Sequence, residues 1–399
     1  MTAQFTMDRR AALAGMASTA IASCTGLPSD EAGASATAAN GGAASLDALA
    51  QRSGRRFGTA IGWSGSNADA GSIQNPRLTA LINQECGIVV PENEMKWQAL
   101  RPSRDTYNFR AMDDIVRWAQ ANGQDVRAHV LLWHRPQWFP EWLNNHDFGA
   151  NPAAEAEQIL TSHIRTVGER YSDTIHSWDV VNEAIDHDAR APIETSLSRA
   201  MGSPEAVLDL AFHTAREVLP GKQLVYNDYM SWEPDHAGHV VDVLRLLEGF
   251  KARGTPVDAL GIQSHIEIFE RDPASGLGQY SEREWRNFLD EVVAMGYDLV
   301  ITEFDVKDRA LPADIAVRDA LIADYTRRYF DVMLDYEQLG DILAWGMVDR
   351  YNWLQYFEPA ERADGLEVRG TPYDSDYQPK PAREAIAQQL ANAPTTYRG

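Results

Sequence analysis

Eight short runs of β-prone apolar residues alternate with helical patterns along most of this chain, and that alternation limits its fold more than any other feature. Successive strands separated by helices form a parallel sheet, because each helix returns the chain to the end of the sheet where the next strand starts. The runs lie at residues 57–62, 87–91, 126–133, 175–182, 224–229, 259–265, 299–304 and 342–348.

Several helix boundaries carry recognisable signals. Residues 203–204 (Ser-Pro) place a capping residue before a proline at the first helical position, and residues 151–152 (Asn-Pro) predict the start of another helix. The helix after residue 204 should stop at Pro-Gly, residues 220–221. Ser281 with Glu284 three residues later predicts a capping box.

Eight strand–helix units without a second linker predict an α/β fold, a single (β/α)8 TIM barrel over residues 46–399. The alternative is a doubly wound open sheet. That fold commonly carries a Gly-rich phosphate-binding turn after its first strand, and none follows residues 57–62.

The first 45 residues are expected to lie outside this domain. Residues 1–24 resemble an export signal, with a twin arginine ahead of an apolar run too short to span a membrane. Residues 21–24 also resemble a bacterial lipobox, which would put a lipid anchor on Cys24; ordinary cleavage is an equal alternative. Residues 25–45, rich in Ala, Gly and Ser, are expected to be a flexible tether. The expected location is periplasmic, tethered to the outer membrane, or secreted.

The net charge of −22, from 36 Lys and Arg against 58 Asp and Glu, argues against nucleic acid and anionic membranes as partners. A neutral substrate held by local contacts is expected instead. Outside the export signal the chain has one cysteine, Cys86, which sits in an apolar run and is predicted to be a buried structural thiol. We expect no cofactor, no metal site and a monomeric protein.

Polar side chains gather where the predicted strands end. In a barrel of this kind the carboxyl ends of the strands form one mouth, where catalytic groups converge. Two of the strands end near a glutamate, Glu183 in one and Glu303 in the other. Two carboxylates at one mouth are the minimum equipment for breaking a glycosidic bond.

The two carboxyl groups are expected to share one proton. At about 5 Å and an effective dielectric near 20, two carboxylates repel by roughly 3 kcal/mol, or about 2 pK units. The protonated member could then donate to a leaving oxygen while the ionised member attacks the sugar.

With these residues in place, the chain resembles glycoside hydrolase family 10, the (β/α)8 endo-β-1,4-xylanases. The resemblance implies a retaining double displacement on xylan and xylo-oligosaccharides. The motifs that carry it lie in family order at residues 92–97, 127–129, 133–134, 178–184, 226–229, 263–265, 301–305 and 345–346.

The resemblance also implies a role for each site residue. Glu183 matches the acid/base and Glu303 the nucleophile. Asn182 matches the residue that bonds the sugar 2-hydroxyl, and His265, supported by Asp305, matches the group that orients the nucleophile. The remaining matches are substrate contacts: Glu92, Asn93, Lys96, His129, Trp133 and Gln263 on the glycone side, Tyr229 on the other side of the cut, and Trp345 and Trp353 as an aromatic floor.

Three departures from the family pattern concern subsites and stability. The family usually reads Trp-His-Ser-Gln after the third strand, and here Pro136 holds the Gln position, so that Gln137 or Arg135 would have to make that contact. Leu354 replaces an arginine that often follows the aromatic floor, and a family cysteine pair is absent.

Two other functions compete with a xylanase. One is a different glycosidase of the same barrel clan, acting on mixed glucans or aryl cellobiosides. The other is an inactive barrel that serves as a glycan-binding lipoprotein, which would be expected to lack one of the two carboxylates. Both carboxylates are present.

Overall fold

The structure, a computed structural model, describes residues 44–269, 272–276 and 278–396. Within these ranges eight parallel strands close into a barrel, since β11 pairs with both β1 and β10. The predicted (β/α)8 barrel is therefore confirmed. Its strands are β1 Arg56–Ile61, β2 Ile88–Pro91, β3 Asp125–Trp133, β4 Ile175–Asn182, β7 Gln223–Asp228, β8 Ala259–Ile262, β10 Asp298–Lys307 and β11 Leu339–Ala344.

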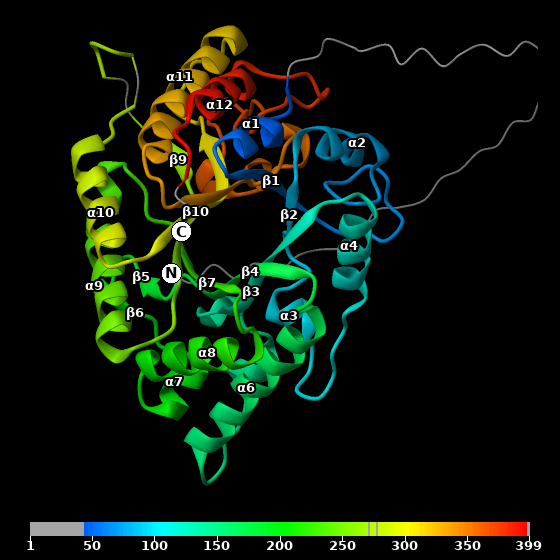
Figure 1. The fold of residues 1–399 in the computed structure, drawn as a ribbon, viewed down its shortest axis with the longest axis vertical. Coiled ribbons are helices and arrows are strands. Elements are labelled where there is room, and N and C mark those ends of the chain that lie inside the picture. The colour runs from blue at the N-terminus through cyan, green and yellow to red at the C-terminus, as the bar shows by residue number, and fades with distance from the viewer. Residues whose placement is uncertain (1–43, 270–271, 277, 397–399) are drawn as a thin grey trace, which may run out of the picture. The chain divides into compact units, whose positions relative to one another are not determined.

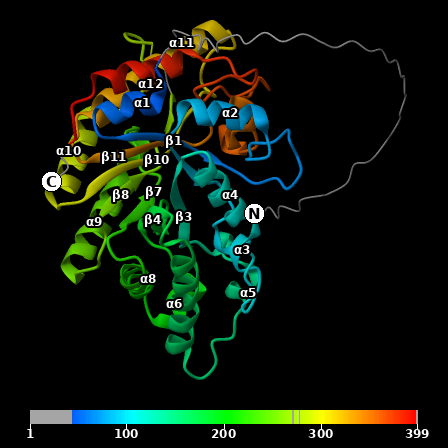
Figure 2. The ribbon, with the colours of Figure 1, turned by 45° about the vertical axis from the view of Figure 1, so that its right-hand side comes forward.

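Helices cover the outside of the barrel (Figure 1 and Figure 2). They are α1 Leu46–Arg52, α2 Pro76–Glu85, α3 Trp97–Leu100, α4 Arg110–Ala121, α5 Glu141–Asn144, α6 Pro152–Tyr171, α7 Ser196–Met201, α8 Pro204–Val218, α9 Ala237–Arg253, α10 Glu282–Ala294, α11 Ile315–Leu334 and α12 Pro381–Asn392. Short strands β5 Ile185–Asp186, β6 Ala191–Pro192 and β9 His265–Glu267, and 3-10 helices η1 Pro136–Trp138, η2 Pro234–His236, η3 Asp349–Tyr351, η4 Trp353–Gln355 and η5 Glu358–Ala360, lie in the loops.

The predicted strands are found with small shifts at their ends, and one is divided. The run 259–265 was expected to be a single strand. Instead β8 ends at Ile262, Ser264 adopts a positive φ of 63°, and β9 continues along β10. The left-handed residue interrupts the ladder, which a pattern of side-chain polarity does not reveal.

The helix starts at residues 152 and 204 are confirmed. The Ser203 hydroxyl accepts a hydrogen bond from the Ala206 amide at 3.2 Å, as an N-cap should. The capping box predicted at Ser281 is wrong, because that side chain makes no cap hydrogen bond. The Glu284 carboxylate accepts instead from Arg283 at 3.1 Å, yet α10 still begins at Glu282.

The barrel strands separate two layers of core. Neighbouring residues of one strand fall in different clusters: Val89 packs in the large outer cluster, whereas Ile88 and Val90 pack in a smaller one. Because side chains alternate across a strand, the smaller cluster fills the barrel interior. Trp345 belongs to it and also lines the cleft described below, so the inner core supports the site from beneath.

Two segments far apart in sequence lie side by side: α1, near the start of the described chain, and α12, near its end (Figure 1). Arg383 of α12 donates to the Ala44 carbonyl at 2.8 Å and pairs with Glu85 at 3.0 Å. The Thr396 amide donates to the Ser53 carbonyl at 2.8 Å. These contacts hold both ends of the described domain against the barrel.

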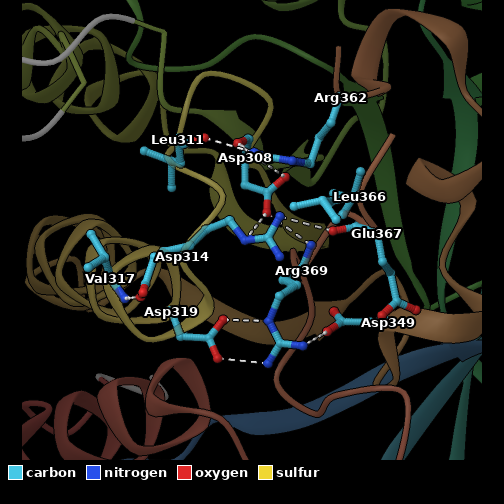
Figure 3. Close-up of polar contacts among 12 residues, drawn as sticks. Asp308, Leu311, Asp314, Val317, Asp319, Asp349, Arg362, Leu366, Glu367 and Arg369 are labelled. Atoms are coloured by element: carbon cyan, nitrogen blue, oxygen red, sulfur yellow. Dashed lines mark hydrogen bonds and ion pairs between the residues drawn. The ribbon is translucent and has the colours of Figure 1, made fainter. Parts of the chain in front are cut away.

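A buried ionic network fastens the long segment that follows β11 to the end of β10 (Figure 3). Arg369 lies between Asp319 of α11, at 2.7 Å, and Asp349, at 3.9 Å. Asp349 also accepts from the Lys380 ammonium at 2.7 Å, and Arg362 lies 3.6 Å from Asp308. This segment carries Trp345 and Trp353, so the network positions one wall of the cleft.

Candidate active site

The carboxyl ends of the barrel strands surround a cleft of about 460 Å³. Every residue singled out from the sequence lines it except Asp305, which lies behind the lining. The predicted residues along the cleft are Glu92, Asn93, Lys96, His129, Trp133, Asn182, Glu183, Tyr229, Gln263, His265, Glu303, Trp345 and Trp353.

Glu183 follows the last residue of β4 and adopts a positive φ of 52°. Its carboxylate accepts a hydrogen bond from Gln263 at 2.8 Å on Oε1 and from the Trp133 indole at 3.1 Å on Oε2. The Arg135 Nε lies 3.1 Å from the same Oε2. Burial raises the pKa of Glu183 above its ordinary 4.5, against the opposing effects of Arg135 and Gln263.

Glu303 lies within β10 and is surrounded by donors. The His265 Nε2 is 3.2 Å from Oε2, and Asn227 donates to Oε1 at 2.8 Å. Burial alone would raise the pKa of Glu303, but the hydrogen bond from His265, the charges of His129 and His265, and the Asn227 amide lower it to about 2. Glu303 is therefore ionised from mildly acidic pH upward.

His265 is held in its charged form. Burial opposes the charge, but Asp305, whose Oδ1 is 2.8 Å from the His265 Nδ1, and Glu303 raise the pKa of His265 to about 9. The chain Asp305–His265–Glu303 thus places an imidazolium against one carboxylate and leaves Glu183 outside its influence.

The pKa values of the two glutamates are shifted in opposite directions, but not mainly for the predicted reason. Mutual repulsion was the predicted cause. For Glu183 the main cause is burial, and the charge of Glu303 raises its pKa less than that of Asp228 does. At mildly acidic pH one carboxyl group can carry a proton while the other stays ionised, which is the arrangement needed for acid-assisted displacement at a sugar carbon.

Three amide side chains connect the carboxylates. Asn227 donates to Glu303 and, at 2.9 Å, to the Asn182 Oδ1; Gln263 donates to that oxygen at 3.2 Å as well as to Glu183. The Asn227 Oδ1 accepts from the Thr302 hydroxyl at 2.7 Å, which fixes the amide with its NH2 toward Glu303. Bonds on both sides hold the carboxylates in a defined relative orientation.

One wall of the cleft is polar. Lys96 donates to Asn93 at 2.8 Å and lies 4.9 Å from the centre of a Trp133 ring. Burial lowers the pKa of Lys96 and raises that of Glu92, although the charge of each opposes the shift of the other. Such closely spaced donors and acceptors suit a ligand rich in hydroxyl groups.

The opposite wall is aromatic. The Trp353 indole donates to the Asp305 Oδ2 at 2.7 Å, and its ring lies 4.9 Å from that of His265. Asp305 therefore orients His265 and Trp353 together. Trp345 packs edge-on to His129 at 5.3 Å. Flat apolar faces of this kind accept the C–H faces of sugar rings.

Sequence reasoning missed part of the lining and one residue behind it, Asn227. Arg135 and Gln137 had been considered only as substitutes at one subsite. Asn227 lay in a quoted motif, but no role was given to it, because an Asn-Asp pair at a strand end is as typical of a turn. The other lining residues, for which no role was predicted, are Trp138, His236, Lys307 and Phe357.

The described residues bear on only some of the remaining predictions. Cys86 is buried, as predicted, and burial raises its pKa. In the part of the chain that the structure describes, no cluster of three His, Cys, Asp or Glu is placed to hold a metal ion, and no helix is long and apolar enough to cross a membrane. The predicted export signal and most of the predicted tether lie outside the described residues.

Comparison with known proteins adds independent information. The profile of glycosyl hydrolase family 10 matches residues 45–389. Endo-1,4-beta-xylanase 3 of Hypocrea jecorina is 30% identical over 343 residues, which cover 86% of this chain and 84% of the relative. Endo-1,4-beta-xylanase B of Humicola insolens is 30% identical over 346 residues, covering 86% of this chain and 87% of that protein.

Among solved structures, the chain is likewise similar to xylanases. The structure of native xylanase 10B from Thermotoga maritima is similar with a TM-score of 0.75 and 27% identity, covering 87% of this chain and 98% of that one. Xylanase 10B from Thermotoga petrophila, solved with xylobiose, also has a TM-score of 0.75, with 28% identity and coverage of 88% and 98%.

Proposed function

Because the chain belongs to glycoside hydrolase family 10, we propose that it is an endo-1,4-β-xylanase, which hydrolyses internal β-1,4-xylosidic bonds of xylan with retention of anomeric configuration. The observation that carries the mechanism is that one cleft places the buried Glu183 beside Gln263 and Arg135, and Glu303 among the donors His265 and Asn227, so that the pKa values of the two glutamates are shifted in opposite directions. The named relatives support xylan and xylo-oligosaccharides as substrates.

In the first step, Glu183 gives its proton to the glycosidic oxygen as the bond from that oxygen to C1 breaks. The Glu303 carboxylate forms a bond to C1 from the opposite face. Burial favours the protonated form of Glu183, and the bonds from His265 and Asn227 keep Glu303 ionised. The product is a glycosyl ester on Glu303 and a free sugar chain.

In the second step, Glu183 acts as a base. It takes a proton from water while the water oxygen bonds to C1 and the bond from C1 to Glu303 breaks. Both glutamates return to their starting forms, and two inversions at C1 give net retention.

The other lining residues hold the substrate. We assign Asn182 to the sugar 2-hydroxyl and Tyr229 to the leaving side. The polar wall on the glycone side comprises Glu92, Asn93, Lys96, His129, Trp133 and Gln263, and the aromatic floor comprises Trp345 and Trp353. Each is a proposal from cleft position together with the family resemblance.

Substrate class is tested by measuring the release of reducing ends from xylan and from cellulose. We expect strong preference for xylan. A preference for cellulose would replace the xylanase assignment by that of another glycosidase of the clan.

The nucleophile is tested with Glu303→Ala. This variant should lose turnover and keep its circular dichroism spectrum, and added azide should restore activity with a product of inverted configuration. The matched variant Glu217→Ala removes an exposed carboxylate that pairs with Arg165 and should keep full turnover. Turnover at the wild-type rate in Glu303→Ala would refute the assignment.

Export of the protein and a lipid anchor on Cys24 remain proposals from the sequence. Mass spectrometry of the mature N-terminus distinguishes them: a diacylglyceryl mass on Cys24 indicates anchoring, and an unmodified new N-terminus indicates ordinary cleavage.

A further inference from the structure

Arg135 occupies an unusually fixed position beside Glu183. It follows the end of β3 and directly precedes Pro136, the first residue of η1. A residue before proline is restricted to extended backbone, and Arg135 has φ −136° and ψ 131°. Its amide donates to the Trp133 carbonyl at 2.8 Å. The backbone therefore fixes the direction in which the Arg135 side chain leaves the chain.

The guanidinium of Arg135 contacts three places at the cleft: the residue after β4, the short strand β5 and the residue after β7. Its Nε lies 3.1 Å from the Glu183 Oε2, and an Nη donates to the Ile185 carbonyl at 3.0 Å and to the Tyr229 hydroxyl at 3.2 Å. The side chain is only 15% exposed. Since the planar group has partners on several sides, it cannot turn away from Glu183 without leaving them unpaired.

We propose that Arg135 is a positioning residue whose guanidinium, held 3.1 Å from the Glu183 carboxylate, sets the upper pH limit of the first chemical step. The proposal rests on the proposed role of Glu183 as acid/base. It assigns a function to the Arg-Pro pair that follows the third barrel strand.

The charged groups around Glu183 act in opposite directions. Burial raises its pKa, as do the charges of Asp228 at the end of β7 and Glu303 in β10. Arg135 is the foremost group that lowers it, followed by the hydrogen bond from Gln263. Lys96 and the Tyr229 hydroxyl also interact with Glu183 electrostatically. The guanidinium of Arg135 thus opposes the rise that burial causes in the pKa of Glu183. The two chemical steps of the proposed reaction give a reason for this opposition.

An acid/base must release a proton in the first step and accept one in the second. With burial unopposed, Glu183 would keep its proton over a wider pH range. The first step would then extend to higher pH, and the second would slow at low pH because less of the basic form is present. Arg135 shifts this balance toward the basic form.

The test is the pH dependence of kcat/KM on an aryl β-xylobioside with a poor leaving group, with Arg135→Met and Arg135→Lys compared with the wild type. In Arg135→Met the basic limb should move up by about one pH unit, because an opposite charge has been removed from within 4 Å. Arg135→Lys should bring the limb part of the way back. The control Arg350→Met removes a guanidinium that pairs with exposed Asp69, and its limb should not move.

Two outcomes would overturn the inference, and both differ from a failure of the proposed function. If Arg135→Met lowers the melting temperature or kcat while the basic limb stays in place, Arg135 serves only the structure. If the basic limb of Arg135→Lys lies at the same pH as that of Arg135→Met, a positive charge at this position does not set the upper pH limit. The proposed function itself fails separately, if Glu183→Ala retains the same basic limb and loses equal activity on good and poor leaving groups.

Discussion

His265 determines which of the two glutamates stays ionised. Its Nε2 faces Glu303, its Nδ1 faces Asp305, and no contact joins it to Glu183 among the described hydrogen bonds and ion pairs. Of the two glutamates, the imidazolium therefore contacts only Glu303. At the residue scale, the difference between the proposed acid/base and the proposed nucleophile comes from these neighbours rather than from the glutamates themselves.

Replacement of His265 by Gln should move the acidic limb of kcat/KM to higher pH. The wild-type limb reflects protonation of Glu303, whose pKa of about 2 is held down partly by His265. Loss of the cation and its hydrogen bond raises that pKa, so the limb should rise by about 1–3 pH units. The pH profile measures this, with His146→Gln as control, because His146 contacts Glu155, Trp142 and Phe148 and does not line the cleft. An unchanged acidic limb would contradict the assignment.

The sequence located the cleft-lining residues well where a strand end is polar. Glu183 and Glu303 interrupt apolar runs, and a buried carboxylate needs a reason to be there. The importance of Asn227 and Arg135, in contrast, was not visible in the sequence. Their importance depends on which strands are neighbours across the barrel, and a single sequence does not give distances between strands.

At the scale of elements, the strand periodicity sufficed to locate the barrel, but the exact helix and strand ends followed side-chain contacts. Ser203 caps α8 as its type suggests, whereas Ser281 does not cap α10. β8 and β9 are separated by the left-handed Ser264, a backbone state with no signal in the apolar pattern. Local signals compete with tertiary contacts, and only the structure shows which prevails.

A glycine in β8 should prove essential for activity. A Cβ on Gly261 would overlap the side chain of Asn227, the amide that donates to Glu303. Gly261→Ala should therefore displace that amide, lower kcat, and lower the free energy of unfolding by about 1–3 kcal/mol through overpacking. Steady-state kinetics and urea unfolding measure the two effects.

Gly58→Ala provides the comparison, because a Cβ there would meet the backbone carbonyl of Ile88 in the next strand rather than a site residue. It should destabilise the β1–β2 pairing, with the folded fraction retaining its kcat. If Gly261→Ala loses stability without losing kcat, the link from β8 to Glu303 is absent.

At the scale of the whole molecule, closure of the barrel depends on contacts between distant parts of the chain. β1 pairs with β11, and the ionic network of Figure 3 holds the segment after β11 against β10 and α11. The number of strand–helix units predicted such closure. The network was beyond prediction, since Asp349 and Lys380 look like ordinary surface charges in sequence.

Lys380→Met should destabilise the whole domain. Lys380 and Asp349 are both buried, and the substitution leaves the carboxylate without its closest cation. Breaking one side of such a pair typically costs about 3–5 kcal/mol. The loss should be measured by urea unfolding at pH 7, with Arg165→Met, whose partner Glu217 is exposed, as a control expected to lose at most about 1 kcal/mol.

The same variant should recover part of its stability in acid. Burial raises the pKa of Asp349, and removal of Lys380 raises it further. Since the folded variant then binds a proton more readily than the unfolded chain does, its deficit relative to the wild type should shrink as pH falls through that raised pKa. A deficit that is constant between pH 7 and pH 4 would show that Asp349 does not carry the effect.

The positive φ of Glu183 has a consequence for protein engineering. A non-glycine residue in the left-handed region is strained by about 1–2 kcal/mol, and here the strain falls on the residue proposed to transfer the proton. Glycine relieves that strain, so Glu183→Gly should melt at a higher temperature than Glu183→Ala, and both should be inactive on xylan. Selection for thermal tolerance alone would thus favour loss of this glutamate, and any screen for hardier variants has to score turnover at the same time.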